Sequence, residues 1–567
     1  MIGTNRKLLA IVGGVTLGFT VLAGCSGMST SPPGSASAAG QPLIIVDNVG
    51  KTFTRTFNPY DQTSLSAAMN MQDLTYEPLL MFNMMNPTQK PIPWLASHYG
   101  WSGDGKTLTF TIRPGVRWSD GQPLTGNDVA FTFNLLKHNP TMQSTAPGPT
   151  PLPSSATASG DKVTLTFGAP EFANLFLIAS TYILPEHRWS SVRAPATYAD
   201  PDPVGSGPYV LSSYSTQQVT FTANPKYWQA NSVHVPEVDF PNYENNTTSN
   251  PALENGQIDY AGNFVSDVAP SYLDVSSTNH TWTPSPPYFA DTNVVGLYLN
   301  VKVPPLDDPM VRQAISYGIN RQDLSNDGEA GYEPVASSSG GLNLPTDNSL
   351  LDRAYANDLK PTGDPGKVSQ ILTSDGYSKA GGLWMKGGQP IKFSIEDPSD
   401  YSDYATDAQL IAGQLNALGF EVSFKGVQDA QWYADYPVGH FDSMIHWGTQ
   451  GPSPIYYFEN WLDYSQSAPL GKSAGGDWER FDNPAAQDAL ALFEGTDNPA
   501  KQQQALNTLQ GIMSTQAPVI PLLYGAAWYE YSTKKYTGWP TQSDQYTNPA
   551  PNAPYLEYTL LHLTPAS

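Results

Sequence analysis

The residues with the most specific chemistry lie between positions 440 and 463. This stretch combines flat aromatic rings with amide side chains, namely Trp447, Gln450, Tyr456, Tyr457, Phe458, Asn460 and Trp461. Aromatic faces pack against pyranose rings, and amides hydrogen-bond hydroxyl groups. The set therefore predicts a binding site for a neutral small molecule. Several of these rings are expected to be core, because 11% of the whole chain is aromatic, and Trp447 and Tyr456 are the first choices for the ligand.

Other motifs predict no reaction chemistry. Residues 471–475 match the Gly-x-Ser-x-Gly pattern but lie in a polar stretch without the strand and helix that a nucleophile elbow needs. The same Gly-Lys-Ser lacks the glycine of a phosphate loop, because Gln466 stands there. His440 and His446 would lie about 20 Å apart along a strand, too far to share a metal. We expect no enzyme, no catalytic residue, no metal and no cofactor.

The amino terminus resembles a bacterial lipoprotein signal. Arg6 and Lys7 precede an apolar run over residues 8–23, which is short for a membrane span. The run ends Leu-Ala-Gly-Cys at Cys25, the only cysteine of the chain. We expect lipid attachment at Cys25 after removal of residues 1–24, with a Ser/Pro/Gly tether over 25–40. An ordinary signal with a chance cysteine is the alternative.

Composition excludes several classes of protein. The chain has 567 residues, enough for two or three domains, and a net charge of −23 that repels nucleic acid. One cysteine excludes internal disulfides, thiolate zinc sites and iron–sulfur clusters. Only 14% of residues are charged, so few groups titrate as the pH falls, and we expect the fold to persist between pH 5 and 3.

Strand patterns dominate the first half of the chain and helical patterns enter in the second. Alternating apolar residues predict half-buried strands at 107–112, 162–167 and 218–222, and the run at 43–46 predicts a short apolar one. Thr125 and Asp128 form a capping-box pair at the start of a helix.

The second half alternates helices with strands. Amphipathic helices are predicted after Asp307, over 405–418 and near 499–513. Gly419 is placed to end the second of these, and a strand follows at 420–424. A strand, a helix and a strand in this order indicate a parallel α/β unit.

A series of motifs along nearly the whole mature length resembles the bacterial extracytoplasmic solute-binding proteins of the oligopeptide, dipeptide and nickel type, called family 5. The pieces follow the family order: 74–80 (LTYEPLL), 109–136, 204–211 (VGSGPYVL), 224–228 (NPKYW), 296–300 (GLYLN), 306–324, 367–377 and 517–524 (APVIPLLY). One such fragment would mean little, whereas the ordered set is specific.

The resemblance implies an α/β, two-lobed periplasmic-binding-protein-like (type II) fold with an extra subdomain in lobe I. Lobe I would comprise 41–295 and 519–567, lobe II would comprise 296–518, and hinge strands would lie near 296–300 and 519–524. It also implies a monomer outside the cytoplasmic membrane that captures a ligand by lobe closure and passes it to the membrane subunits of an ABC importer.

The ligand class stays open at this point. Peptide-binding relatives use an aspartate in the loop after a lobe II strand to hold the ligand ammonium, but no aspartate lies between Trp447 and Tyr456. Asp442, Glu459 or a carboxylate of lobe I could substitute. The Trp-Gly-x-x-Gly-Pro-x-Pro loop resembles the oligosaccharide-binding branch. We expect an oligosaccharide first, an oligopeptide second, and nickel, heme, an opine or another small solute third.

The expected ligand set takes residues from both lobes. Besides the lobe II loop it includes Tyr76 and Asn300, whereas Glu77 is expected to be a buried structural carboxylate. The complete set is Trp447, Tyr456, Tyr457, Gln450, Tyr76, Asn300 and Trp461. A secreted hydrolase and a surface receptor that signals by contact are the alternatives from other functional classes.

Overall fold

The structure is a computed structural model that describes residues 40–47, 52–61, 65–86, 89–139, 142, 151–344, 346–448 and 451–567. The predicted signal segment, Cys25, the tether up to residue 39 and Gln450 lie outside the described residues.

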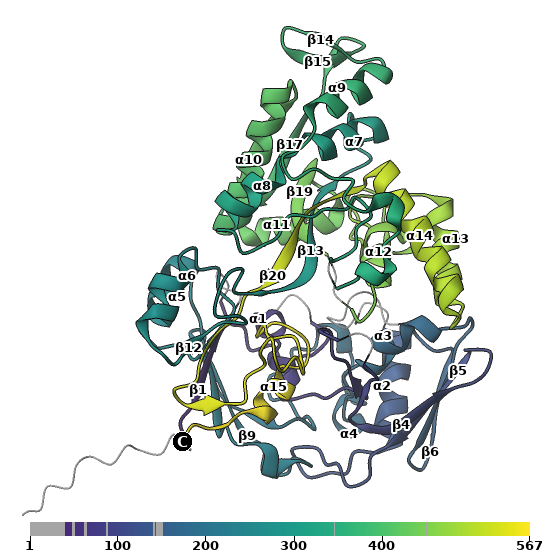
Figure 1. The fold of residues 1–567 in the computed structure, drawn as a ribbon. Coiled ribbons are helices and arrows are strands. Elements are labelled where there is room, and N and C mark those ends of the chain that lie inside the picture. Colours follow the sequence, from purple (N-terminus) through teal and green to yellow (C-terminus); the bar gives the residue numbers. More distant parts are fainter. Residues whose placement is uncertain are drawn as a thin grey trace, which may run out of the picture. The chain divides into compact units, whose positions relative to one another are not determined.

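The first large sheet has seven strands, and the predicted strand β1 lies inside it (Figure 1). β1 pairs in parallel with β10 on one side and with β11 on the other, so the chain turns to opposite sides of β1. Three of its four residues are fully buried, as expected for a central strand. The strand order is β12 (Asn279–His280), β21 (Glu530–Ser532), β11 (Tyr260–Ala261), β1 (Leu43–Val46), β10 (Glu237–Pro241), β9 (Gln218–Ala223) and β8 (Tyr209–Tyr214).

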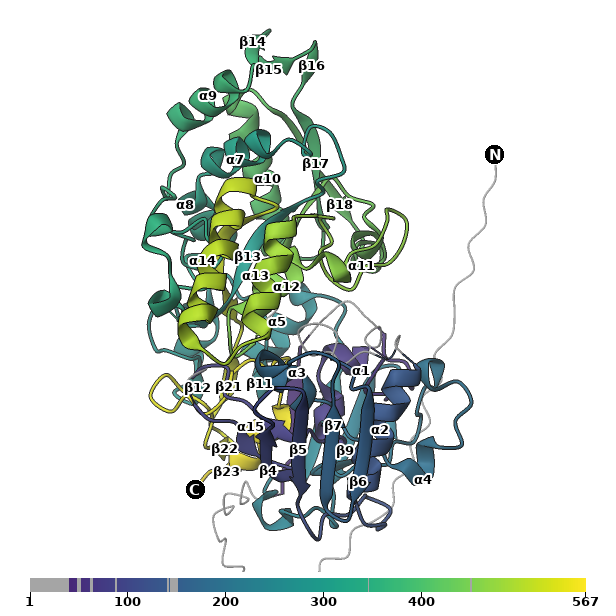
Figure 2. The ribbon, with the colours of Figure 1, turned by 90° about the vertical axis from the view of Figure 1, so that its right-hand side faces the viewer.

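A second, antiparallel sheet forms a separate layer that carries helix α2 (Gly126–His138) (Figure 2). Its order is β4 (Ala96–Trp101), β5 (Thr107–Ile112), β7 (Lys162–Thr166) and β6 (Ser155–Ser159). In β5 every second residue is buried, which confirms the alternation seen in the sequence. Thr125 and Asp128 form the predicted capping box, which satisfies backbone donors at the first turn of α2.

The third sheet has five strands and contains the predicted parallel unit. β17 and β18 pair in parallel and are joined by α10, which ends at Gly419 in a left-handed conformation with φ of 100°. The order is β18 (Glu421–Val427), β17 (Lys392–Pro398), β19 (Ser443–Trp447), β13 (Ala290–Leu299) and β20 (Val519–Ala527), with α7 (Pro309–Gly318) and α10 (Ser402–Leu418) packed beside it.

The remaining helices and small sheets complete the layers. The helices are α1 (Leu65–Ala68), α3 (Leu175–Ala179), α4 (Glu186–Trp189), α5 (Asn246–Glu254), α6 (Val268–Ser271), α8 (Arg321–Asp323), α9 (Pro365–Ser374), α11 (Asp429–Asp435), α12 (Ile455–Leu462), α13 (Pro484–Glu494), α14 (Pro499–Gln516) and α15 (Leu556–His562). The short strands are β2 (Leu80–Met81), β3 (Ile92–Pro93), β14 (Ser378–Ala380), β15 (Leu383–Lys386), β16 (Gln389–Pro390), β22 (Tyr536–Thr537) and β23 (Thr564–Pro565).

We call the part built on the seven- and four-stranded sheets lobe I, and the part built on the five-stranded sheet lobe II. The two expected hinge strands are β13 and β20, which pair with one another in antiparallel fashion. The expected boundary at 518/519 falls at the start of β20, which belongs by pairing to the lobe II sheet. The chain then enters the seven-stranded sheet at β21.

Two glycines of the VGSGPY motif are required by close packing, a reason that the sequence does not reveal. A Cβ atom on Gly205 would lie 1.8 Å from the carbonyl oxygen of Thr75, and one on Gly207 would lie 2.5 Å from that of Leu74. The motif leads directly into β8 and lets the chain pass against residues 74–75.

Candidate functional site

The loop after β19 folds back against α12, and its glycines make this possible. A Cβ atom on Gly448 would lie 2.8 Å from Cδ1 of Tyr457, and one on Gly451 would lie 2.0 Å from Cδ2 of Tyr456. Real side chains do not approach so closely, so only glycine fits at either position. The Trp-Gly-x-x-Gly spacing therefore reflects the packing of the loop onto the aromatic rings of α12.

The rings of α12 are packed inside the protein. Trp461 is fully buried, stacks on Tyr457 and donates from Nε1 to the Tyr298 hydroxyl at 2.7 Å. Tyr456 is 1% exposed and donates from its hydroxyl to the carbonyl of Ala173 in lobe I at 3.0 Å. Tyr457 donates to the carbonyl of Thr292 at 3.3 Å. Tyr456 and Trp461 thus make structural contacts, whereas Tyr457 also lines a cavity.

Trp447 belongs to a different aromatic group on lobe II. It is partly exposed, and its ring packs against Trp432 and His446 with centroid separations of 6.1 and 4.3 Å. Burial lowers the pKa of His446 to about 4, so this histidine is an uncharged part of the core. Tyr433 also contacts Trp432, edge to face at 5.1 Å. We call Tyr433 and Trp447 with Trp432 the aromatic platform.

The charge of Asp47 in lobe I acts on Tyr433 of this platform. The pKa of Tyr433 is raised to about 12, first by burial and then by the negative charges of Asp429 and Asp47. Asp47 directly follows β1, the strand at which the order of the parallel strands reverses. Ligands of open α/β sheets bind outside the carboxyl end of a strand at such a point. No motif in the sequence points to Asp47.

A small cavity of about 30 Å³ lies beside Tyr457, lined by Met84 and Met85, by residues 451–454 and by Asp291, Thr292, Asn343, Thr346 and Asp347. Asn343 contacts both aspartates: its Nδ2 donates to the backbone carbonyl of Asp291, and its backbone N–H donates to the carboxylate oxygen Oδ2 of Asp347, each at 3.3 Å. Among the described residues, Oδ1 of Asn343 and Oδ1 of Asp291 have no hydrogen-bond partner. Burial raises the pKa of Asp291 to about 7 and that of Asp347 to about 6. The cavity therefore presents unpaired acceptors.

Three other sequence-selected residues are engaged within the protein. Tyr76 is fully buried and donates its hydroxyl to Asp200. Asn300 donates from Nδ2 to the carbonyls of Gly439 and Phe441 at 3.1 and 3.0 Å. These contacts account for both side chains, so we leave Tyr76 and Asn300 out of the proposed ligand set. Glu77 is fully buried and Oε1 accepts three hydrogen bonds, as a structural carboxylate should.

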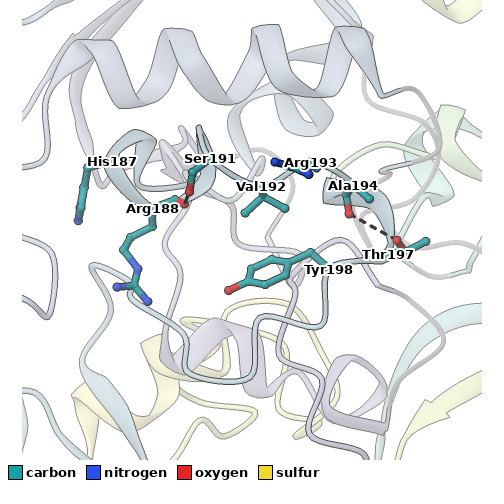
Figure 3. A pocket seen from close by; sticks show the side chains of 8 residues that line it. All are labelled: His187, Arg188, Ser191, Val192, Arg193, Ala194, Thr197 and Tyr198. Atoms are coloured by element: carbon teal, nitrogen blue, oxygen red, sulfur yellow. Dashed lines mark hydrogen bonds between the residues drawn. The ribbon is translucent and has the colours of Figure 1, made fainter.

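A second, wider depression of about 620 Å³ lies on lobe I between α4 and residue 198 (Figure 3). Arg188 and Tyr198 are among the side chains that line it, and none of the expected ligand residues does. Within the described ranges, no cluster of three or more His, Cys, Asp or Glu side chains could hold a metal ion. No helix in the described part of the chain is long and apolar enough to cross a bilayer.

Comparison with known proteins places the chain in a family. Residues 90–469 match the family model of the bacterial extracellular solute-binding proteins, family 5 (middle region), and the chain belongs to this family. It is 27% identical to the nickel-binding periplasmic protein of Escherichia coli K12 over 399 residues, covering 67% of this chain and 71% of that protein. It is 23% identical to the oligopeptide-binding protein OppA of Bacillus subtilis 168, covering 78% and 81%.

A solved structure shares the fold along almost the whole chain. The mannohexaose-bound periplasmic oligopeptide-binding protein of Thermotoga maritima superimposes with a TM-score of 0.80 at 24% identity, covering 92% of this chain and 98% of that one. The fold is thus the two-lobed, type II periplasmic-binding-protein fold. The protein is an extracytoplasmic solute-binding component of the kind that serves ABC transporters.

Proposed function

We propose that the protein captures a short oligosaccharide between its lobes and delivers it, unaltered, to the membrane subunits of an ABC importer. The observation that carries this proposal is the partly exposed ring of Trp447 on the aromatic platform, whose member Tyr433 is acted on by the charge of the Asp47 carboxylate at the end of β1. A flat ring supports the apolar face of a pyranose, while a carboxylate accepts hydrogen bonds from its hydroxyl groups. The mannohexaose-bound relative of the same fold is consistent with this ligand class.

Ligand entry requires the lobes to separate. A cavity of about 30 Å³ has room for one or two water molecules, whereas sites for small ligands measure about 300–1,000 Å³. A ligand that contacts both lobes only after closure binds the closed form more tightly than the open form. This difference in affinity shifts the population toward the closed form. We place this motion at the hinge strands β13 and β20. The lobe boundaries are those expected from the sequence, except that β20 belongs to lobe II.

Titration calorimetry with ligand-free protein tests the sugar assignment. We expect heat from cello- or manno-oligosaccharides, and a loss of affinity of about two- to tenfold in Trp447→Ala, because one stacking ring contributes about 0.5–1.5 kcal/mol and about 1.4 kcal/mol is a factor of ten. Trp101→Ala is the matched control, since Trp101 is also partly exposed but lies in β4. Equal losses in both variants, or binding of peptides alone, would reject the sugar assignment.

An oligopeptide is the second candidate, and the acceptor cavity favours it. Asp291, Asp347 and Asn343 together could hold a ligand ammonium group, the role that relatives give to an aspartate absent from 448–455 here. Under this alternative, Asp291→Asn would abolish heat from a mixture of short peptides and leave sugar binding unchanged. The same variant would leave all binding unchanged if the ligand never enters this cavity.

We also propose that Cys25 carries the lipid that holds the protein at the outer face of the cytoplasmic membrane, as a monomer without enzymatic activity. Cys25→Ser should release the protein from membranes and abolish labelling by a fatty-acid analogue. Turnover of an oligosaccharide or peptide by the purified protein would contradict the binding-only assignment.

A further inference from the structure

The two lobes contact one another directly at a seam between α12 and residues 171–176. Helix α12 of lobe II lies against residues 171–176 of lobe I, where the Tyr456 hydroxyl donates to the Ala173 carbonyl at 3.0 Å. The ring of Tyr456 also packs edge-on against Phe176, with centroids 5.4 Å apart. Both rings are almost fully buried, and one apolar cluster runs from the four-stranded sheet through this contact to α12, α13 and α14.

Carboxyl groups from both lobes surround this contact. Glu171 lies at the lobe I side, and Glu459, Asp463 and Glu494 lie on or directly after α12 and α13. Glu459 is 5% exposed, and its Oε1 has no hydrogen-bond partner among the described residues. Asn174 donates to Glu171 Oε2 at 2.8 Å.

The groups that face these carboxyls offer little positive charge. Lys106 follows Gly105, whose carbonyl accepts the backbone N–H of Glu171. The ammonium of Lys106 donates to the carbonyl of Gly168 at 3.2 Å. Among the described residues, the phenol of Tyr456 interacts with two of these carboxyls and with the phenol of Tyr555, and both phenols are buried. Ionisation of the carboxyls would therefore place like charges, one buried and three partly exposed, beside the seam without a compensating cation.

We propose that this seam is a pH-dependent latch, which holds the lobes of the ligand-free protein together while its carboxyls are protonated and loosens as they ionise. Tyr456 is then a positioning residue that sets ligand affinity through closure, without touching the ligand. The latch goes beyond the proposed transport function, because it needs no ligand.

The direction of the effect follows from the titration of the seam. Burial, followed by the charges of Glu171 and Asp463, raises the pKa of Glu494 from 4.5 to about 7. Burial and the charges of Glu494, Asp463 and Glu171 raise the pKa of Glu459 well above its usual value. The part of these shifts that comes from contact with lobe I, including the charge of Glu171, is lost when the lobes separate. The closed form is therefore favoured at acid pH and loses stability as the pH rises towards 7.

Small-angle scattering of the ligand-free protein between pH 4.5 and 8.5 tests the latch. We expect the radius of gyration of the wild type to rise with pH, and the double variant Glu459→Gln, Glu494→Gln to keep its acid value at pH 8.5. Asp488→Asn is the matched control, because Asp488 is exposed on the same helix α13. It should follow the wild-type curve. Tyr456→Phe should open at a lower pH than the wild type, because the hydrogen bond to Ala173 is lost.

A constant radius for the wild type, or the same rise in the double variant, would overturn the proposal. Circular dichroism of each variant checks that it folds, and Glu171→Gln, from the lobe I side, replaces the double variant if that one does not. No ligand is present in these measurements. The latch and the sugar assignment therefore fail or succeed independently.

Discussion

Replacing Glu77 by Gln should remove a large part of the pH dependence of folding stability. Glu77 is fully buried, and its Oε1 accepts hydrogen bonds from Trp94 Nε1, Tyr227 Oη and Trp228 Nε1 at 2.8, 3.0 and 3.0 Å. These bonds favour the carboxylate, but burial is the stronger influence and raises the pKa from 4.5 to about 7. Gln keeps the accepting oxygen and the shape without the titration.

The sign and size of the effect follow from linkage. Between pH 4.5 and 7 the folded protein holds a proton at Glu77 that the unfolded chain releases, so the free energy of unfolding falls as the pH rises through this window. Below pH 4.5, Glu77 is protonated in both states, and its full contribution to the free energy of unfolding is present. One pKa unit corresponds to about 1.4 kcal/mol, so a pKa difference of about 2.5 amounts to about 3 kcal/mol of unfolding free energy. Between pH 4 and 8, the wild type should lose about 3 kcal/mol more than Glu77→Gln.

Urea unfolding at both pH values, followed by tryptophan fluorescence, measures this difference. Glu244→Gln is the control, because Glu244 is exposed, and its profile should match the wild type. Parallel profiles for the wild type and Glu77→Gln would show that Glu77 ionises equally easily in both states. The structural assignment of this carboxylate would then be wrong.

Further variants test the packing of the loop, of the hinge region and of lobe I. Gly451→Ala should lower stability by about 1–3 kcal/mol in urea unfolding, since its Cβ would lie 2.0 Å from the Tyr456 ring, whereas Gly475→Ala, with its nearest atom at 4.0 Å, should be neutral. Arg321→Met should cost about 1–3 kcal/mol for each carbonyl left unpaired, because the buried guanidinium donates to Pro521 and Ser316 at 2.8 and 3.0 Å. Tyr76→Phe should cost about 1–2 kcal/mol and leave calorimetric ligand binding unchanged, because its hydroxyl bonds Asp200.

Local chemistry explains which elements the sequence could predict. The capping box at Thr125, the alternation in β5 and the left-handed Gly419 each depend on neighbours within a few residues, and each is found as expected. The reason for Gly205 and Gly207 could not be read in this way, because the atoms they approach lie in residues 74–75, about 130 positions earlier.

The site was harder to predict, because aromatic residues serve cores and ligands equally well. One signal was available: α12 reads Ile-Tyr-Tyr-Phe-Glu-Asn-Trp-Leu, and a helix that is apolar on most sides is expected to be buried. All eight residues are buried, so Tyr456 and Trp461 lie in the interior. Asp47, Asp291 and Asp347 come from three distant segments, and only the fold brings them to the aromatic platform and the cavity.

Peptide capture by the cavity and lobe closure should depend on pH in the same range, and two variants can separate them. The pKa values of Asp291 in the cavity and Glu494 at the seam are both about 7, in each case chiefly because of burial. If the cavity and the seam act separately, Asp291→Asn should change the pH dependence of peptide affinity and leave sugar affinity and the ligand-free radius of gyration unchanged. Glu494→Gln should change that radius even without ligand. A change of the ligand-free radius in Asp291→Asn of the same size would mean that the cavity carboxylate is itself part of the closing contact.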